Sequence, residues 1–523
     1  MRAKPPVLSP IGRTFLLFSP HLCWYHKRMN TLRSLLEAVG IFDARVPHDL
    51  SIASICQHSQ DCRPNSVFFA FSGLHTNGLL FVREAVKRGA VCVISEKPIT
   101  SDPESQGFYA YTVEQAHTCF ALMCAALHDN PQEKLSVIGI SGTDGKSTTC
   151  DYLYQMLKAN EVKVGVLTTV SMDDGSGKVD SPYRQSTPEP DQLQAFLARC
   201  VDNQVSHVIL ECTSHALSKQ YDRLAGISFA AAIITKVTSE HLEFHHSLEE
   251  YTNAKVNLVK ALQEGGLLLT STDNSRYETF IDALCDSCSA IVLGKDIPMR
   301  IEFMGYQGVV VEIYGQHLPT PLLLPSLATN ALLAAFTASH LLNKEPKSLL
   351  QLIPRLQPVK GRMHLIENKL GVRVIIDFAH TADAYEGVFS FAKRTCEGGD
   401  IIAVFGCAGE RDSTKRPAMG KIANKYSSVI ILTEEDPRKE GNQAIFSDLR
   451  YLMHNPLCTV WEIEDRRMAI RKALSIALGG DTLLFLGKGH EKSIERADGK
   501  IAWDEIAEVQ AALQEEEQRR GCK

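Results

Sequence analysis

The stretch ISGTDGKSTT combines glycines, a lysine and hydroxyl side chains at a spacing that could hold a phosphate group. Gly142 and Gly145 would let backbone N–H groups turn toward phosphate oxygens. Lys146 would reach the outer phosphates, and Ser147 would offer its hydroxyl to Mg²⁺. The generic pattern GxxxxGK[ST] requires a glycine where this chain has Ile140, so an ordinary strand-to-helix turn is the alternative interpretation.

Apolar residues on both sides of this loop predict the elements that would position it. The preceding run LSVIG is typical of a buried strand, and Cys150, Leu153, Met156 and Leu157 follow the loop at helical spacing. A loop between a strand and a helix places the positive N-terminal end of the helix beside a bound phosphate. We therefore expect a nucleotide-binding loop between a strand and a helix.

Acidic and histidine side chains follow two further predicted strands. Glu211 ends the apolar run HVIL, and the segment TSEHLEFHH gathers histidines and acids. Such groups at the carboxyl ends of parallel strands could bind a hard metal ion such as Mg²⁺. A solvated loop is the simpler interpretation of either cluster taken alone. Composition alone places Lys255, in the segment YTNAK, on a helix surface.

Four more polar segments follow apolar strands nearer the C-terminus: DFAHTADAY, FGCAGERDSTKRP, TEEDPRKE and FLGKGHEKS. Asp377 and His380 could orient a ribose or carry a proton. The cations that could clamp a carboxylate or a phosphate are Arg411, Lys415, Arg416 and Arg438. Surface ion pairing with nearby acids is the alternative for each arginine taken singly.

The composition is that of an ordinary globular protein, with 44% hydrophobic and 22% charged residues among 523 and a net charge of -6. The acidic balance gives no basic footprint for nucleic acid, and no apolar run approaches the ~18 residues of a membrane span. The fifteen cysteines are interpreted as isolated, reduced thiols without a zinc site. We therefore expect a cytoplasmic protein that binds neither nucleic acid nor membrane.

Strand and helix patterns alternate along the chain, which predicts an α/β protein of about three domains. Residues 1–29 are expected to be a disordered extension, and the true start codon is left open. Residues 30–133 are expected to form a first domain, and residues 134–355 a second that carries the phosphate loop. Residues 356–523 are expected to form a third domain with a Rossmann-like parallel sheet.

The joint order of these segments resembles the Mur ligase family, and within it the MurE type. GTDGKSTT is similar to the family's GTNGKTT loop, ECTSH to EVSSH, SEHLEFH to DHLDYH, and YTNAK to its YxxAK lysine motif. Further along, GRM matches the family's GRM/GRF motif, DFAHTADA is similar to DYAHTPDA, FGCAGERDSTKRP to FGCGGDRDxxKRP, and GKGHE is unchanged. The family's own loop lacks the earlier glycine, so Ile140 is compatible with nucleotide binding.

The resemblance implies three domains: a UDP-sugar-binding N-terminal domain, a central P-loop ATPase domain, and a Rossmann-like C-terminal domain that binds an amino acid. It implies ATP-dependent addition of a diamino acid to the D-glutamate of UDP-MurNAc-L-Ala-D-Glu through an acyl phosphate, in peptidoglycan precursor synthesis. A monomer is expected. Replacements within the motifs, such as Lys236 for an asparagine, leave a catalytically degenerate scaffold as one alternative. A MurF-type or folylpolyglutamate-type ligase is another.

The same resemblance implies the nucleotide and metal residues. ATP would contact Gly142, Thr143, Asp144, Gly145, Lys146, Ser147, Thr148, Asn330, Arg362 and Asp377. Two Mg²⁺ ions would be bound by Ser147, Glu211, His241 and Lys255, the last as a carbamate formed with CO₂. The catalytic residues would be Lys146, Lys255, His241 and Arg411.

The UDP-sugar residues implied by the resemblance come from two parts of the chain. They are Ser59, Leu74, His75, Thr76, Ser186, Thr187, Thr213 and Arg223. The segment between Ser214 and Arg223 is longer than is typical of the family, and Gln60 replaces the arginine that usually follows the serine.

The incoming amino acid would contact Arg411, Glu435, Asp436, Pro437, Arg438, Gly487 and Glu491. Asp436 replaces the asparagine of the DNPR segment that reads meso-diaminopimelate in this family. An added carboxylate favours a substrate whose distal end is a bare ammonium, such as L-lysine or L-ornithine. Because Arg438 is kept, meso-diaminopimelate stays open as the alternative.

Overall fold

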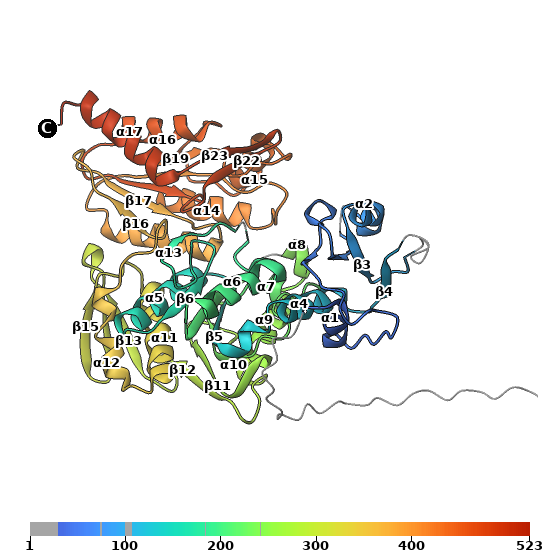
Figure 1. The fold of residues 1–523 in the computed structure, drawn as a ribbon. Coiled ribbons are helices and arrows are strands. Elements are labelled where there is room, and N and C mark those ends of the chain that lie inside the picture. The colour runs from blue at the N-terminus through green and yellow to red at the C-terminus, as the bar shows by residue number, and fades with distance from the viewer. Residues whose placement is uncertain (1–29, 74–75, 100–106, 184, 241, 523) are drawn as a thin grey trace, which may run out of the picture.

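Three larger sheets, each with its own helices, build most of the described part of the chain (Figure 1). The computed structural model describes residues 30–73, 76–99, 107–183, 185–240 and 242–522. The extension expected at 1–29 lies outside these residues. The three sheets follow one another along the chain, and we call the sheets with their helices the N-terminal, central and C-terminal domains.

The N-terminal domain is a four-stranded parallel sheet in the order β1-β2-β3-β4. Its strands are β1 (Ser54–Cys56), β2 (Ser66–Phe69), β3 (Ala90–Ser95) and β4 (Tyr109–Thr112), and its helices are α1 (Leu32–Ala38), α2 (Val82–Lys87) and α4 (Ala116–Leu127). Helices α1 and α4 pack together on one face, where Phe69 and Phe120 meet edge to face with ring centroids 5.1 Å apart.

The central domain is an eight-stranded sheet in the order β12-β11-β10-β5-β9-β6-β7-β8. Its parallel strands are β5 (Ser136–Ser141), β6 (Val164–Leu167), β9 (His207–Glu211), β10 (Phe229–Ile234), β11 (Leu262–Ser271) and β12 (Ser289–Leu293), and β7 (Ser171–Asp173) and β8 (Val179–Asp180) extend it in antiparallel fashion. Strand β5 lies in the interior of this sheet, so its continuous apolar run is buried on both faces, as expected of a parallel strand.

Helices cover both faces of the central sheet. They are α5 (Lys146–Ala159), α6 (Pro190–Asp202), α7 (Ser214–Leu217), α8 (Leu242–His245), α9 (Leu248–Lys260), α10 (Tyr277–Ile281), α11 (Pro325–Leu342) and α12 (Pro346–Leu350). One face packs against α5 and α11 through Ile138 and Ile140 of β5. The other packs against α6 and α9, where Val137 and Leu258 belong to a second apolar cluster.

A three-stranded antiparallel sheet was not predicted from the sequence. It comprises β13 (Met299–Phe303), β14 (Val309–Ile313) and β15 (Gln316–Thr320), and it lies between β12 and α11 along the chain. Val309, Val311 and Ile313 alternate with more exposed residues and join the core cluster of α5 and α11. Period-two alternation with glycines at the turns is the sequence signal of such a meander.

The C-terminal domain is a six-stranded sheet in the order β16-β17-β21-β18-β19-β20, which confirms the predicted Rossmann-like arrangement. Strands β17 (Arg373–Asp377), β18 (Ile401–Phe405), β19 (Val429–Leu432), β20 (Thr459–Glu462) and β21 (Thr482–Leu486) are parallel, and β16 (His364–Ile366) is an antiparallel edge. The helices are α13 (Ala382–Thr395), α14 (Arg416–Tyr426), α15 (Asn442–Arg450), α16 (Arg466–Ile476) and α17 (Glu505–Arg519).

The last parallel strand of the C-terminal sheet, β21, departs from the predicted alternation of strand and helix. Strand β21 is followed by a hairpin, β22 (Ser493–Arg496) with β23 (Gly499–Ala502), before α17 begins. Short 3₁₀ turns complete the chain at Ser59–Asp61, Gly78–Phe81, Pro131–Lys134, Gly305–Gln307 and Ile353–Arg355.

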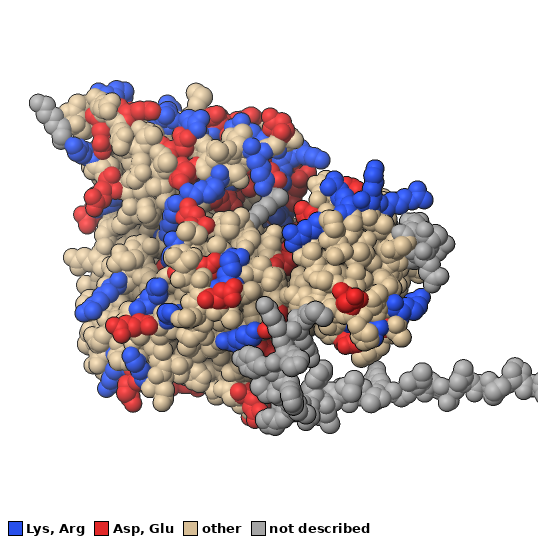
Figure 2. Space-filling model, in the orientation of Figure 1, with Lys and Arg blue, Asp and Glu red and all other residues tan. Residues whose placement is uncertain are grey.

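Acidic and basic side chains are interspersed over the visible face of the molecule (Figure 2). Among the described residues, none of the helices combines the length and the apolar content that crossing a membrane requires.

Two neighbouring ion pairs join α16 to α17, and they differ in burial. Arg466 and Glu505 are fully buried and bonded at 2.8 and 2.6 Å, whereas Arg467 and Glu508 form a similar pair that is partly exposed. Removing one charge of a buried pair leaves the other uncompensated, which costs about 3 kcal/mol. We predict that Glu505→Gln lowers the midpoint of thermal unfolding clearly, whereas Glu508→Gln changes stability by under ~1 kcal/mol. Equal shifts for the two variants would contradict this prediction.

Candidate functional site

The predicted phosphate loop connects β5 to α5, as the sequence indicated. Gly142 and Gly145 have φ angles of +149° and +86°, which side chains other than glycine rarely adopt. A Cβ atom on Gly142 would lie 1.8 Å from Thr235 Oγ1. Lys146 Nζ donates to the carbonyl oxygens of Thr143 and Gly142 at 2.7 and 3.2 Å, so its ammonium folds over the loop where phosphates would lie.

Oxygen ligands gather beside the start of α5. Ser147 Oγ donates to Glu211 Oε2 at 2.8 Å, and the Thr169 N–H donates to the same oxygen at 3.0 Å. Glu211 is only 3% exposed at the end of β9. A buried carboxylate beside a hydroxyl suits Mg²⁺. In most proteins, water and phosphate oxygens complete the coordination shell of this ion. His241 lies outside the described residues, and among those described no group of three or more His, Cys, Asp or Glu forms a ready metal cluster.

Lys255 is buried, and its interpretation from composition as a surface lysine is wrong. The side chain of this residue in α9 is 1% exposed, and Nζ donates to the Gly142 carbonyl at 2.8 Å. Its Nζ also lies 4.3 Å from the centre of the Tyr251 ring. Burial and the nearby Lys146 ammonium hold the pKa of Lys255 well below its ordinary value. The neutral amine is therefore favoured directly behind the phosphate loop.

The central and C-terminal domains meet at this loop. Thr381 Oγ1, at the N-terminus of α13, donates to the Asp144 carboxylate at 3.0 Å. Thr235 Oγ1 donates to the Asp144 backbone carbonyl at 2.7 Å from the central domain. A salt bridge of 2.5 Å between Lys236 and Asp383 lies beside these contacts. The replacement of asparagine by Lys236, noted as a departure from the family pattern, thus forms an interdomain contact.

A second interdomain pair joins Glu240 to His380, whose Oε1 and Nε2 atoms lie 2.8 Å apart. Burial disfavours the charged imidazole, but the adjacent carboxylate outweighs burial and raises the pKa of His380 above its ordinary value. Because the pKa of His380 is raised in the folded state, its pair with Glu240 stabilises the folded protein fully at pH values below the ordinary histidine pKa. This stabilisation is lost as the pH rises through the raised pKa.

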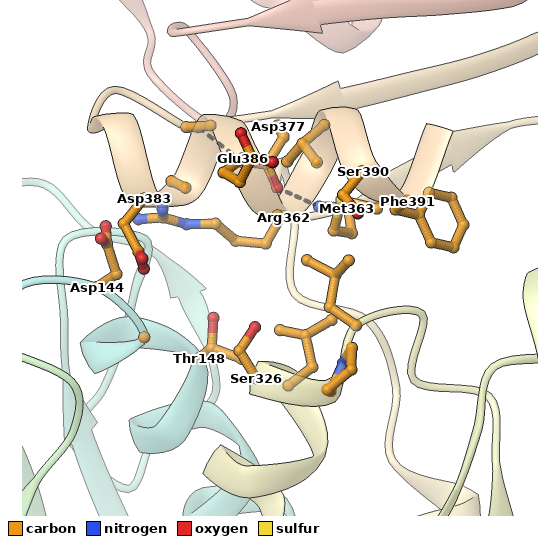
Figure 3. Close-up of a pocket in the computed structure, with 18 of the residues that line it drawn as sticks. Asp144, Thr148, Ser326, Arg362, Met363, Asp377, Asp383, Glu386, Ser390 and Phe391 are labelled. Carbon is orange, nitrogen blue, oxygen red and sulfur yellow. Dashed lines mark hydrogen bonds between the residues drawn. The ribbon is translucent and has the colours of Figure 1, made fainter. Parts of the chain in front are cut away.

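A cavity of about 420 Å³ lies between these two domains, within the usual size range of small-ligand sites (Figure 3). The cavity gathers six of the residues predicted to contact ATP: Asp144, Gly145, Thr148, Asn330, Arg362 and Asp377. Figure 3 shows Arg362 extending above Thr148 toward Asp144 and Asp383.

Asp377 organises the wall of this cavity. One carboxylate oxygen accepts the Met363 N–H at 2.6 Å, and the other accepts the Ala379 N–H at 2.7 Å. Arg362 stacks over the Phe378 ring, with its guanidinium carbon 4.5 Å from the ring centre. The aspartate therefore fixes the GRM segment that carries Arg362.

The residues predicted to contact the UDP-sugar form two separate groups. Ser59 and Thr76 line a cavity of about 380 Å³ in the N-terminal domain, and Ser59 Oγ donates to Glu84 at 2.9 Å. Leu74 and His75 lie outside the described residues.

The second group lies in the central domain, next to Glu211. Thr187 Oγ1 donates to the Glu211 carbonyl at 2.7 Å and accepts the Thr213 N–H at 3.0 Å. Arg223 Nη1 donates to the Thr187 carbonyl at 3.1 Å, and Ser186 Oγ lies 2.5 Å from Thr169 Oγ1.

The long segment before Arg223 has a structural role that the sequence did not indicate. Asp222 accepts a hydrogen bond of 2.7 Å from Thr118 of α4, so this segment joins the central domain to the N-terminal domain. Tyr221 lies edge to face with His117 of the same helix, with ring centroids 5.4 Å apart.

The residues predicted to contact the amino acid lie on loops after β18, β19 and β21. Asp436 accepts hydrogen bonds from Lys488 Nζ and from the Glu495 N–H, each at 2.9 Å. Lys488 also donates to Glu491 at 2.5 Å. Arg438 donates to Glu495 Oε2 at 3.2 Å, and Arg411 is exposed on its loop. Lys488 and Glu495 were not predicted, and only Lys488 had a signal, its place within GKGHE.

One arginine of this region, with its acidic partners, has a structural role. Arg416 is fully buried and bonds Glu440 and Asp448 at 2.5 and 2.9 Å. Glu435 is 8% exposed, and a Cβ atom on Gly487 would lie 2.5 Å from its carboxylate oxygen. The glycine is therefore required where the two loops meet. Pro437 is buried beside them, and Gly409 approaches its carbonyl.

Family models match two parts of the chain. The Mur ligase middle domain matches residues 140–337, and the Mur ligase glutamate ligase domain matches residues 361–489. Among similar sequences, the UDP-N-acetylmuramyl-tripeptide synthetase of Borrelia garinii subsp. bavariensis is 33% identical, over 89% of this chain and 93% of its own length. The UDP-N-acetylmuramoyl-L-alanyl-D-glutamate--2,6-diaminopimelate ligase of Caldanaerobacter subterraneus subsp. tengcongensis is 32% identical, over 90% and 96%.

Solved structures share the fold. A UDP-N-acetylmuramoyl-L-alanyl-D-glutamate--2,6-diaminopimelate ligase superposes with a TM-score of 0.61 at 23% identity, covering 92% of this chain and 99% of that one. The MurF ligase of Thermotoga maritima in complex with ADP gives a TM-score of 0.60 at 18% identity, covering 89% and 98%.

We predict that Gly142→Ala weakens binding of Mg²⁺·ATP at least about tenfold, or 1.4 kcal/mol. Thr235 Oγ1 is fixed by hydrogen bonds to Ser141 and Asp144, so it cannot move away from the added methyl group. Gly177→Ala is the matched control, because Gly177 has a φ of +131° but no atom within 4 Å of the new Cβ position. Isothermal titration calorimetry measures both variants. Wild-type affinity in Gly142→Ala would contradict the assignment of this loop to the nucleotide.

Proposed function

Because the chain belongs to the Mur ligase family, we propose that it is an ATP-dependent ligase that adds a diamino acid to the D-glutamate of UDP-MurNAc-L-Ala-D-Glu. The observation that carries this proposal is that three features of the site lie together. The phosphate loop, the buried Ser147–Glu211 pair and the interdomain cavity meet at the carboxyl ends of the central strands. Open α/β sheets bind their ligands at this edge.

The first chemical step is transfer of the γ-phosphoryl group of ATP to the side-chain carboxylate of the D-glutamate. Two anions must approach one another, so positive charge is needed between them. Lys146 Nζ and the loop N–H groups supply it from the start of α5, exchanging the carbonyl contacts of Lys146 for phosphate oxygens. Mg²⁺, when bound by Ser147, Glu211 and His241, supplies further charge and orients the phosphates.

The second step is attack of the α-amine of the amino acid on the acyl phosphate, which forms the amide and releases phosphate. Water would hydrolyse the acyl phosphate, so the site must be closed. Contacts of Asp144 with Thr381 and of Glu240 with His380 close the two domains across the loop. Arg411, on the loop after β18, is the candidate cation for the carboxylate of the incoming amino acid.

We assign the sugar site to residues 30–133, the nucleotide site to residues 134–355 and the amino-acid site to residues 356–523. The cavity beside Ser59 and the contacts of Arg223 support a substrate that spans the first two domains. Since one chain carries the residues of all three sites, we propose a cytoplasmic monomer with no membrane partner.

The direct test is phosphate release by the purified protein with ATP, Mg²⁺ and UDP-MurNAc-L-Ala-D-Glu, with L-lysine, L-ornithine and meso-diaminopimelate offered separately. Release that depends on one amine, with the matching amide found by mass spectrometry, is expected. Nucleotide binding without turnover would instead indicate a degenerate scaffold. Turnover only with a tripeptide or folate substrate would indicate a MurF-type or folylpolyglutamate-type ligase.

We further propose that Lys255 is carbamylated. A neutral amine is the form that adds to CO₂, and burial beside Lys146 favours that form. The resulting carbamate is an anion that would bind a second Mg²⁺ next to the Gly142 carbonyl.

We predict that removal of CO₂ lowers ligase activity and that bicarbonate restores it. Lys255→Arg should lose at least about tenfold in kcat under both conditions, or 1.4 kcal/mol of barrier, because arginine cannot form the carbamate. Lys260→Arg, on the exposed end of the same helix, is the matched control. A carbamate signal in the carbon-13 spectrum of the wild type after labelling with bicarbonate gives a readout besides activity. Full activity of Lys255→Arg would refute the proposal.

The charges around the amino-acid loops support a substrate without a distal carboxylate. Asp436 is partly neutralised by Lys488, so its own charge favours lysine less than the sequence indicated. Arg438, however, is already paired with Glu495, which competes with any substrate carboxylate for the guanidinium. We therefore propose L-lysine or L-ornithine in preference to meso-diaminopimelate.

We predict that Glu495→Gln shifts specificity toward meso-diaminopimelate by freeing Arg438. The ratio of kcat/KM for meso-diaminopimelate to that for L-lysine should rise about tenfold, which corresponds to about 1.4 kcal/mol. Glu462→Gln, which breaks an exposed pair with Arg450 in the same domain, should leave the ratio unchanged. A wild-type enzyme that already prefers meso-diaminopimelate would contradict the specificity proposal.

A further inference from the structure

Two cysteines of the central domain form a C-x-x-C pair, and the prediction of isolated thiols is wrong at this place. Cys285 and Cys288 flank Asp286 and Ser287 in the loop between α10 and β12. Their sulfur atoms lie 2.6 Å apart. Cys285 is exposed and Cys288 is partly buried.

Backbone hydrogen bonds hold this loop against the start of β11. The Cys288 N–H donates to the Cys285 carbonyl at 3.0 Å, and the Gly265 N–H donates to the Ser287 carbonyl at 3.1 Å. Cys288 Sγ lies 3.3 Å from the Gln263 carbonyl oxygen. The turn that carries both cysteines is therefore anchored to the start of β11.

Exposure distinguishes this pair from the other close pair of cysteines. Cys56 and Cys62 have sulfurs 3.4 Å apart, but both are buried in the N-terminal domain at 5% and 6% exposure. Thiol–disulfide exchange requires in-line access to sulfur. Of these two pairs, both within the described residues, the exposed one therefore meets both requirements, proximity and access.

We propose that Cys285 and Cys288 form a redox-active dithiol that is oxidised reversibly to an intramolecular disulfide by an organic disulfide, R–S–S–R. The Cys285 thiolate attacks one sulfur of the reagent, forming a mixed disulfide and releasing one R–S⁻. The Cys288 thiolate then attacks the Cys285 sulfur, which forms the internal disulfide and releases the second R–S⁻. The protons of the two protein thiols end on the two released thiols, and two electrons pass to the reagent.

The surroundings assign the two roles. Side-chain hydrogen bonding with Cys288, and then with Ser287, lowers the pKa of the exposed Cys285 thiol. Burial, and then the hydrogen bond to Cys285, raise the pKa of Cys288. The exposed Cys285 is thus the attacking sulfur, and Cys288 is the sulfur that resolves the mixed disulfide.

The pair lies away from the proposed ligase site. Gln263 and Gly265 belong to the N-terminal end of β11, whereas the phosphate loop follows the carboxyl end of β5 in the same parallel sheet. In Figure 1, α10 and this end of β11 lie on the side of the central domain that faces away from the C-terminal domain. The proposal can therefore be tested without ligase turnover, and its failure would be separate from failure of the proposed function.

The test treats the reduced full-length protein with glutathione disulfide and follows its mass and its thiol content. Wild type should lose two thiols and the mass of two hydrogen atoms, with the disulfide mapped to the peptide that contains both cysteines. Cys288→Ser should instead retain one glutathionyl group on Cys285, and Cys285→Ser should be modified about tenfold more slowly. Dithiothreitol should reverse each change.

Cys56→Ser is the matched control, because it removes one member of the buried pair and should leave the wild-type result unchanged. The far-ultraviolet circular dichroism of every variant verifies that the fold is kept. A wild type that retains both thiols, or that accumulates a stable glutathionyl group at Cys285, would overturn the proposal. Modification of Cys285→Ser at Cys288 as fast as that of Cys288→Ser would overturn the assignment of roles.

Discussion

The contacts of Asp144 in the middle of the phosphate loop are the constraint on which the rest of the site depends. Its backbone carbonyl is bound by Thr235 of the central domain, and its carboxylate is bound by Thr381 of the C-terminal domain. One residue thus links the phosphate loop to both domains, and the Lys236–Asp383 and Glu240–His380 pairs reinforce the same junction. The interdomain cavity lies at this junction, and both Asp144 and Arg362 of the GRM segment line it. The amino-acid loops belong to the domain that the junction positions.

The region beneath the loop is electrostatically costly without ligands. The Glu211 side chain is buried, and burial near Lys146 disfavours the charged form of Lys255. Burying charge is unfavourable unless partners compensate for it. Anionic phosphates, metal ions and a carbamate would each supply such compensation, so part of the stability of this region is expected to come from its substrates. The proposed carbamate would give the buried Lys255 of α9 a role that packing alone does not require.

Much of the fold could be predicted because its signals are local. The strand and helix around Gly142 and Gly145 follow from apolar periodicity and glycine spacing. The burial of Lys255 could not be predicted from periodicity, since a helical pattern does not reveal which other element covers a given face. The pairing of Arg438 with Glu495 depends on a hairpin 57 residues further along, which has no signature near the arginine.

Other parts stay predictions. The domain boundaries were inferred from the alternation of strand and helix patterns, and the roles of the site residues from motif order. His241, Leu74 and His75 lie outside the described residues. The C-x-x-C spacing of Cys285 and Cys288 is present in the sequence, and the prediction of isolated thiols missed it. Proximity and exposure are properties of the folded chain, and these decided which cysteines could react.

The most direct test of the acyl-phosphate route is the fate of oxygen in the substrate. UDP-MurNAc-L-Ala-D-Glu labelled with oxygen-18 in the side-chain carboxylate of its glutamate would be incubated with the protein, ATP, Mg²⁺ and L-lysine. Phosphoryl transfer to that carboxylate predicts one labelled oxygen in the released phosphate for each amide formed. Amide formation with unlabelled phosphate would contradict the route.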